Sequence, residues 1–360
     1  AQLYLGRGFE RTLDISENHI GVYNGVLQLH PLKLIQSFHE IPISRSCGSN
    51  FKPYNPDDPY IAELEKNIKL LICNDVGEFD EDTYTYIMMF LASSLDGRKK
   101  QPIFFLWLGE GGNGKSFLLE MHIQTMATVI GNGYGNKINV SFFTGTGRDN
   151  GGGPDTEKMT MKNARFTYCS ESDAGAELKM SKIKEFTGGE TIAGNDKNEK
   201  QDQFRINSVF AFCTNHDPRL KGLDYGTLRR IVGFRFRRVF KHDPDESNPL
   251  EHKINEKFIK TVPDTQEHRE AYLAILSHYY TILMEKYGGS LENAKSPNII
   301  KDTKEYISEQ NSYSKFVYEQ LIHIGKTVPT TDIQIKNIPI QEVITKFRKW
   351  HIETIDSNVA

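Results

Sequence analysis

The sequence predicts an α/β protein with a mostly parallel sheet that helices cover, flanked by a smaller region on each side. One observation behind this prediction is an apolar strand pattern at 102–108, followed by a glycine-rich loop at 109–114 and the start of a helix at 117–121. Another is a series of short apolar runs separated by helix-compatible segments; the runs span residues 165–171, 209–213 and 231–239. Strands that alternate with helices favour a parallel sheet with both faces covered.

Residues 1–95 are expected to form a smaller, mainly helical, collar-like domain ahead of the sheet. Residues 19–29 alternate in the manner of a hairpin, and Asn24-Gly25 favours a type I′ turn between its strands. Two helices are expected to follow, near 58–76 and 80–95.

Residues 96–240 are expected to hold the sheet, with a further short strand at 140–144. Residues 241–360 are expected to form a C-terminal region that is helical or winged-helix-like. A helix near 267–287 carries aromatic and aliphatic residues at spacings of three and four, which indicates a buried face rather than a cofactor site.

Two more helices are expected in the tail, at 313–321 and 340–350. A break at Pro329 separates them, because proline cannot continue a helix.

Composition narrows the classes of protein to which the chain can belong. The net charge of −3 creates no global basic field, so nucleic-acid binding would need a local patch or the inner surface of a ring. No apolar run approaches the ~20 residues of a membrane span, and the first residues lack the apolar core of a signal peptide. The four cysteines have no C-x-x-C spacing, which argues against zinc and favours a reducing, intracellular setting. The chain begins with Ala1 rather than Met, so we expect it to be part of something longer.

A phosphate-binding motif follows the strand at 102–108. Residues 109–116 fit G-x-x-x-x-G-K-[ST]; they are Gly109, Glu110, Gly111, Gly112, Asn113, Gly114, Lys115 and Ser116. The loop is predicted to direct its backbone N–H groups at a phosphate chain, with Lys115 at the β- and γ-phosphates and Ser116 on Mg²⁺. The sequence therefore predicts a site for ATP and Mg²⁺.

An acidic residue at the end of a neighbouring strand should complete such a site. Glu171, which follows the strand at 165–170, is the best candidate for a general base or a Mg²⁺ ligand. Asp173 is a second candidate for Mg²⁺, and its alternative role is the cap of a helix.

Two further features follow in the chain. Asn215 stands at the end of the strand at 209–213, where an amide could sense the γ-phosphate, although a turn asparagine is the simpler interpretation. Arg229 and Arg230 precede the strand at 231–239. An arginine there could reach the active site of a neighbouring subunit as an arginine finger, or it could belong to a solvated basic pair.

This ordered set resembles the superfamily 3 helicases. It comprises the phosphate loop, Glu171, the K-x-x-T-G-G motif at 184–189, Asn215 and the R-R-I-x-x-F motif at 229–234. The pattern is most similar to the poxvirus-type primase-helicases of large DNA viruses and to related phage and plasmid proteins. The N-G-V-L-x-L element at 24–29 extends the resemblance. The basic, aromatic cluster at 347–351 is similar to part of a C-terminal DNA-binding module, so the resemblance implies a role in DNA binding for residues 241–360.

The resemblance implies an AAA+-like core and an enzyme that is an ATP-dependent DNA helicase. It also implies a homo-oligomer, usually a hexamer, that translocates on single-stranded DNA at a replication fork during viral DNA replication. It makes Asn215 the sensor and Arg230 the preferred finger, with Arg229 second. A hairpin at about 191–205 would line the central channel, where Lys197 and Lys200 would grip DNA phosphates.

Several further expectations come from the same resemblance. A primase domain is expected upstream in the full-length protein, and the protein is expected in the host cytoplasm, with the nucleus as the alternative. The chain departs from many relatives at Glu190, where Asp is common, and at Asn195, where Arg is common.

Two other classes of function stay open from the sequence. A P-loop kinase or small NTPase that acts on a metabolite would need an acceptor-binding lid but neither Asn215 nor the two arginines. A non-catalytic, nucleotide-dependent scaffold would not need the intact set of Lys115, Ser116 and Glu171.

Overall fold

The computed structural model describes nine segments of the chain. They are residues 13–36, 41–98, 101–127, 133–145, 156–170, 174–194, 202–220, 225–310 and 340–354. The chain divides into two compact units, residues 1–300 and residues 301–360. None of the helices in the described segments combines the length and the apolar character that crossing a membrane requires.

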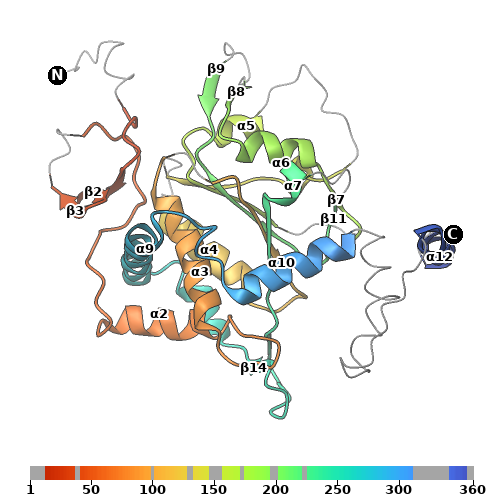
Figure 1. Cartoon of the computed structure of the whole chain (residues 1–360). Helices are drawn as coiled ribbons and strands as arrows, with labels where there is room; N and C mark the ends of the chain where they lie inside the picture. The colour runs from red at the N-terminus through yellow and green to blue at the C-terminus, as the bar shows by residue number, and fades with distance from the viewer. Residues whose placement is uncertain are drawn as a thin grey trace. The chain divides into compact units, whose positions relative to one another are not determined.

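Near the N-terminal end of the described residues lies a small antiparallel sheet of three strands, coloured red in Figure 1. The strands are β1 (His19–Val22), β2 (Gly25–Leu29) and β3 (Leu32–Ile35). The predicted hairpin is confirmed, but its predicted turn is wrong, because Val22 pairs with Gly25 and leaves Tyr23 and Asn24 as the loop. Neither loop residue has a positive φ, whereas a type I′ turn needs two. Gly25 has a φ of 148°, and a Cβ there would lie 2.4 Å from the Ile35 carbonyl oxygen.

The two helices predicted for this part of the chain are present but shorter. Helix α2 spans Pro59–Lys69, helix α3 spans Glu81–Ala92, and the 3-10 turn η1 spans Ser93–Leu95. Each helix begins where an aspartate side chain, Asp58 or Asp80, accepts hydrogen bonds from backbone N–H groups of the first turn.

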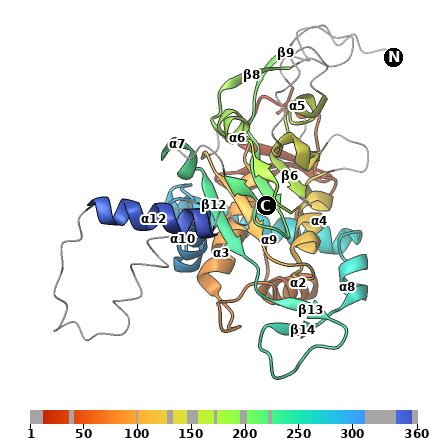
Figure 2. The ribbon, with the colours of Figure 1, turned by 90° about the vertical axis from the view of Figure 1, so that its right-hand side faces the viewer.

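The central sheet has five strands, and each neighbouring pair within it is parallel. Its order is β12-β4-β10-β6-β5. The strands are β4 (Phe104–Leu108), β5 (Gly135–Lys137), β6 (Phe166–Ser170), β10 (Val209–Cys213) and β12 (Ile231–Arg235). The predicted α/β class with a parallel sheet is therefore confirmed. Figure 2 shows the sheet with helices beside it.

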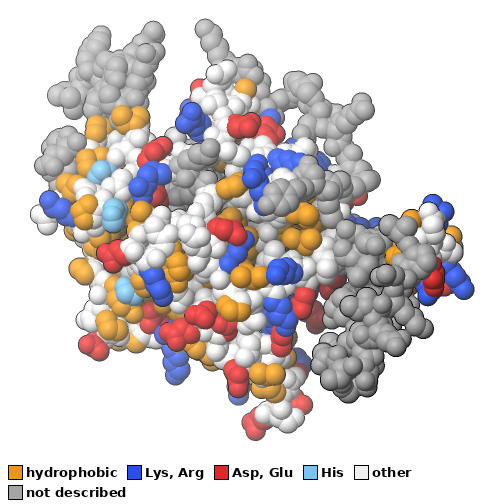
Figure 3. Space-filling model, in the orientation of Figure 1, with side chains coloured by type: hydrophobic (Ala, Val, Ile, Leu, Met, Phe, Trp, Pro, Cys, Tyr) orange, Lys and Arg blue, Asp and Glu red, His pale blue; other side chains and the backbone are white. Residues whose placement is uncertain are grey.

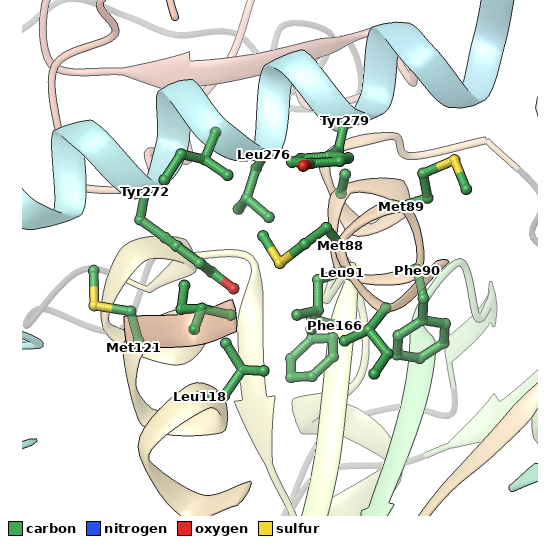
Figure 4. Close-up of a cluster of buried hydrophobic side chains, with 14 of the residues drawn as sticks. Met88, Met89, Phe90, Leu91, Leu118, Met121, Phe166, Tyr272, Leu276 and Tyr279 are labelled. Carbon is green, nitrogen blue, oxygen red and sulfur yellow. The ribbon is translucent and has the colours of Figure 1, made fainter. Parts of the chain in front are cut away.

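One face of the sheet packs on three helices. They are α3, α4 (Lys115–Met126) and α9 (Gln266–Tyr287). Figure 4 shows the cluster they form, in which Met88 of α3, Leu118 of α4 and Leu276 of α9 meet Phe166 of β6. The aromatic stripe predicted as a buried face of the helix at 267–287 is therefore confirmed as core.

The opposite face of the sheet is lined by aromatic rings. Phe104 packs against Phe143 with ring centroids 5.0 Å apart, and Phe142 packs against Phe186 at 4.9 Å. Phe186 belongs to α6 (Met180–Thr187), and Phe142 belongs to the 3-10 helix η2 (Val140–Phe142). The strand predicted at 140–144 is therefore wrong, because the Asn139 side chain accepts from the Ser141 N–H and caps a helical turn.

The remaining elements of the first unit are short. The helices are α5 (Thr156–Thr160), α7 (Tyr225–Leu228) and α8 (Glu256–Thr261), and the strands are β7 (Glu177–Leu178), β8 (Thr191–Gly194), β9 (Asp202–Arg205), β11 (Arg219–Leu220), β13 (Val239–Lys241) and β14 (Glu251–Lys253). The predicted strand at 231–239 ends early, since β12 stops at Arg235 and β13 starts a separate pair with β14.

Elements from the regions before and after the predicted sheet domain contact each other and the domain itself. Helix α9, from the predicted C-terminal region, contacts α2 and α3 of the predicted N-terminal domain as well as α4. The first compact unit thus contains parts of all three predicted domains, and the boundaries at 95/96 and 240/241 stay a prediction.

The second unit is represented by the end of α10 (Pro297–Gln310) and by α12 (Ile340–Thr354). Helix α12 confirms the helix predicted at 340–350, and Phe347 stacks on Trp350 within it at 6.2 Å. The helix predicted at 313–321 lies outside the described residues.

Candidate functional site

The glycine loop joins the end of strand β4 to the start of helix α4. Gly114 has a φ of 80° and is the N-cap of α4, with no side chain hydrogen-bonded to the first turn. The first N–H groups of a helix lack intrahelical acceptors, and they attract an anion together with the helix dipole. The strand, loop and helix predicted for this motif are therefore present, and the loop geometry suits a phosphate.

Lys115 lies within this loop and is only 4% exposed. Its ammonium group donates to the carbonyl oxygen of Gly109 at 2.7 Å and to that of Glu110 at 2.9 Å. It also donates to the side-chain oxygen of Asn113 at 3.0 Å. Burial lowers the pKa of the Lys115 ammonium, because a charged amine is destabilised away from water. Phosphate oxygens could replace these acceptors and would supply the negative charge that the loop oxygens lack.

Asn113 fastens the loop to the chain that follows β12. Its side-chain amide donates to the carbonyl oxygens of Phe236 at 3.2 Å and Arg238 at 2.6 Å. The Phe240 N–H donates to the Gly112 carbonyl oxygen at 2.8 Å. We call residues 236–240 the strap, because they run along the glycine loop and hold it.

The strap is anchored in turn to the end of helix α2. The Arg238 guanidinium donates to the Leu70 carbonyl oxygen at 2.9 Å and to that of Gly77 at 2.5 Å. Sequence reasoning placed Asn113 in the loop but missed its contacts with the strap, and it missed Arg238 altogether. The only signal was the concentration of arginines at 235–238.

Asn215 lies at the same edge of the sheet as the loop. Strand β10 is parallel to both β4 and β6, and Cys213 pairs with Trp107 on one side and Ser170 on the other. The residues after these strands therefore leave the sheet side by side. Asn215 is exposed and lines one cavity together with Gly111 and Ser116.

The acidic candidates Glu171 and Asp173 lie outside the described residues. Ser170, which precedes Glu171, is described and ends β6 beside Cys213. Ser116 is exposed at the start of α4. Within the described segments, no three His, Cys, Asp or Glu side chains are grouped closely enough to hold a metal ion. The Mg²⁺ site formed by Ser116, Glu171 and Asp173 stays a prediction.

Arg229 and Arg230 lie at the opposite edge of the sheet. Ile231, which follows them, pairs with Phe104 at the start of β4. Five strand residues separate that edge from the glycine loop, which corresponds to roughly 15 Å at about 3.3 Å per residue. The backbone of the two arginines therefore leaves the sheet at the end away from the glycine loop of their own chain.

The two arginines differ in their surroundings. Arg230 donates to the Thr187 hydroxyl at 3.0 Å and to the Gly226 carbonyl oxygen at 3.1 Å. It is thereby held against the T-G-G motif, to which Thr187 belongs. Arg229 is exposed. The preferred finger of the sequence prediction is thus engaged inside its own chain, while the second choice is accessible.

The predicted hairpin at 191–205 is present as β8 and β9, which pair antiparallel from Thr191 with Arg205 to Gly194 with Asp202. Lys162 forms an ion pair with Asp202 at 2.5 Å at its side. Glu190 is exposed just before β8. The candidates Lys197 and Lys200, and also Asn195, lie outside the described residues.

The chain was compared with known proteins. Residues 107–230 match a family described as a family of unknown function, DUF5906. The chain is 28% identical over 356 residues to "Putative primase C962R" of African swine fever virus, with 98% of this chain and 35% of that protein covered. It is 24% identical over 356 residues to "Putative helicase L207/L206" of Acanthamoeba polyphaga mimivirus, with 95% and 34% covered.

A structural match was also found. The structure described as the A form apo structure of the NrS-1 C terminal region has a TM-score of 0.43 and 13% sequence identity, covering 91% of this chain and 82% of that chain. The chain spans about a third of the length of the viral relatives it matches. The chain is therefore homologous to proteins of large DNA viruses that are named as primases and helicases.

Proposed function

We propose that this chain is the ATP-dependent helicase part of a viral primase-helicase and that it belongs to the superfamily 3 class. The observation that carries the proposal is the cavity shared by Lys115, Ser116 and Asn215 at one edge of the parallel sheet. The names of the viral relatives support a role in DNA replication. A primase domain elsewhere in the full-length protein and a place of action in the host cytoplasm belong to the same proposal.

Each residue of the site has a role in the proposed reaction. Lys115 balances the charge of the β- and γ-phosphates, and the N–H groups at the start of α4 bind the phosphate oxygens. Asn215 orients the attacking water at the γ-phosphate, and Glu171 accepts its proton. When bound, Mg²⁺ neutralises the charge that develops on the phosphates, with Ser116 among its ligands.

The first test is ATP hydrolysis with and without single-stranded DNA. We expect hydrolysis that DNA stimulates, and we expect Lys115→Ala to reduce it by at least about a hundredfold, since it removes a charge from the transition state. Lys33→Ala is a matched control, because Lys33 is exposed on β3. Hydrolysis that ignores DNA in a protein that stays monomeric would contradict the helicase assignment and favour a metabolite-directed NTPase.

The second test concerns the active site between subunits. We propose that the chain assembles into a ring, in the hexameric form usual for this class, and that an arginine from the neighbouring subunit completes each site. Arg229 suits this role better than Arg230, because Arg229 is exposed and Arg230 is bonded to Thr187. Mixing inactive Arg229→Ala protein with inactive Lys115→Ala protein should restore part of the hydrolysis, whereas no restoration would count against a finger at Arg229.

Arg230→Ala provides the comparison. We expect this variant to lose stability, because it removes the bond to Thr187, and to show weaker restoration in the same mixing experiment. Equal restoration by both arginine variants would leave Arg230 as good a finger as Arg229.

A further inference from the structure

A second cavity, of about 340 Å³, opens at the end of the central sheet that is away from the glycine loop. It lies where strands β6 and β10 begin, since Arg165 and Asn207, which come shortly before these strands, line it. The glycine loop and Asn215 follow the other ends of the strands, and five strand residues correspond to roughly 15 Å. The cavity is therefore separate from the proposed nucleotide site.

Three arginines from distant parts of the chain line this cavity. Arg45 comes from the segment after β3, Arg165 precedes β6, and Arg205 ends β9. Arg45 is half-buried and donates to the Gly133 carbonyl oxygen at 2.7 Å. Arg205 is exposed, and its guanidinium has no hydrogen-bond acceptor among the described residues. A guanidinium carries five N–H donors, so most of those on Arg45 and Arg205 are available to a ligand.

Arg165 is a fixed positive charge in the wall of the cavity. Its side chain is 7% exposed, and its guanidinium carbon lies 4.5 Å from the centroid of the Tyr134 ring. The guanidinium donates to the carbonyl oxygen of Leu95 and, at 2.7 Å, to that of His19. Because these partners are neutral, they hold the guanidinium in place without cancelling its charge.

Two carboxylates also line the cavity, and they leave one net positive charge against the three arginines. Both carboxylate oxygens of Asp14 accept from Ser44, one from its N–H at 2.9 Å and the other from its hydroxyl. Glu17 is exposed, so water screens its charge. The lining therefore favours an anion.

The backbone of this wall is held in a costly conformation at two positions. Asp14 has a φ of 57° and Asn163 a φ of 64°, and they are the two non-glycine residues with a positive φ in the described segments. Both line the same cavity. Such conformations persist where the surroundings fix them, and they are concentrated at sites that bind ligands.

We propose that this cavity binds a phosphate group, with Arg45 and Arg205 as direct donors and Arg165 as the charge behind them. The planar fork of an arginine matches the oxygens of a phosphate, and the volume is large enough to admit the sugar attached to it. The phosphate could belong to the backbone of single-stranded DNA, since Arg205 ends the β8–β9 hairpin, or it could be free in solution. Only the DNA source rests on the proposed function.

The first experiment measures the binding of a fluorescent oligothymidylate by anisotropy over a range of salt concentrations. Arg45→Gln and Arg205→Gln should each weaken binding about tenfold, which is the effect of one charge-assisted hydrogen bond. Each should also reduce the slope of log affinity against log salt by about 0.7, because one phosphate contact is lost. Arg219→Gln is the matched control and should bind like the unaltered protein, because Arg219 is exposed on β11 and outside the cavity.

The second experiment titrates inorganic phosphate by calorimetry while Mg²⁺ and a non-hydrolysable ATP analogue occupy the nucleotide site. Phosphate binding that both cavity variants lose, with unchanged affinity for DNA, would assign the cavity to a free phosphate. Unchanged binding of both ligands in both variants would overturn the proposal.

Two further readouts keep the result unambiguous. Arg205→Gln should keep the unfolding midpoint of the unaltered protein, so it decides the question if Arg45→Gln misfolds through loss of its bond to Gly133. If the ATP analogue does not bind, the proposed function fails alone, because Lys115→Ala should still bind phosphate in the cavity and the two cavity variants should not.

Discussion

Replacing Asn113 by alanine should destabilise the protein by about 3 kcal/mol. The side chain is 3% exposed and takes part in three hydrogen bonds, donating to Phe236 and Arg238 and accepting from Lys115. A hydrogen bond contributes about 1 kcal/mol on average, and a buried group left without a partner costs roughly 1–3 kcal/mol. Lys115 keeps its two carbonyl acceptors, so the loss should come mainly from the two carbonyl groups of the strap.

The assay is urea unfolding followed by circular dichroism, in which the midpoint shifts while the slope stays constant. Asn67→Ala is a suitable control, because the Asn67 side chain makes a single exposed bond to the Glu63 carbonyl oxygen. We expect a change within about 0.5 kcal/mol for that variant. A loss below about 1 kcal/mol for Asn113→Ala would refute the view that this side chain fastens the glycine loop to the strap.

Two further predictions concern helix α4, which begins at the glycine loop. Gly114→Ala should lower the free energy of unfolding by about 1–3 kcal/mol, because a φ of 80° strains any residue other than glycine and the new Cβ would lie 2.4 Å from Leu71 Cδ2. Gly111→Ala is the control for the same unfolding assay and should lower it less, because a Cβ at Gly111 would have no atom within 4 Å. His122 is fully buried, and burial lowers the pKa of its imidazole to about 3 from the ordinary 6.5. Between pH 6.5 and about 3, the imidazole therefore takes up a proton in the unfolded chain but not in the folded one. The free energy of unfolding should consequently fall as the pH decreases from about 6.5. In His122→Gln the dependence of unfolding free energy on pH between 5 and 6 should be shallower by up to about 1.4 kcal/mol per pH unit, and an unchanged slope would count against a neutral His122.

Local sequence patterns correctly predicted the strand, glycine loop and helix at the centre of the molecule. The apolar run before Gly109 and the helical residues after Lys115 are contiguous, so the strand, loop and helix could be recognised from neighbouring residues alone. Asn215 was found in the same way, because the end of an apolar strand is visible in the sequence and parallel strands end at one edge.

Contacts between residues that lie far apart in the chain could not be predicted from the sequence. Nothing near Arg238 in the sequence indicates that its guanidinium binds the carbonyl groups of Leu70 and Gly77, about 160 residues earlier. The engagement of Arg230 by Thr187 was hidden for the same reason. At 140–144 the apolar residues suggested a strand, but a single hydrogen bond to Asn139 selects a helical turn.

From the sequence, we expected no basic field from the molecule as a whole. The small net charge excluded a strongly basic molecule, and Figure 3 shows Lys and Arg side chains interspersed with Asp and Glu on the face that it displays. Nucleic-acid contact would thus depend on particular local residues rather than on a field from the whole molecule.

The covering of the central sheet has a practical consequence for how this protein can be cut or recombined. Residues 107–230 contain the glycine loop and most of the other motifs, yet Leu118 and Phe166 share one buried cluster with Met88 and Leu276, which lie outside that range. An excised motif segment would therefore expose a broad apolar face to water and would tend to aggregate. A chimaera that exchanges this segment between relatives would need to carry α3 and α9 along with the glycine loop, so the transferable piece is defined by the packing and not by the motifs.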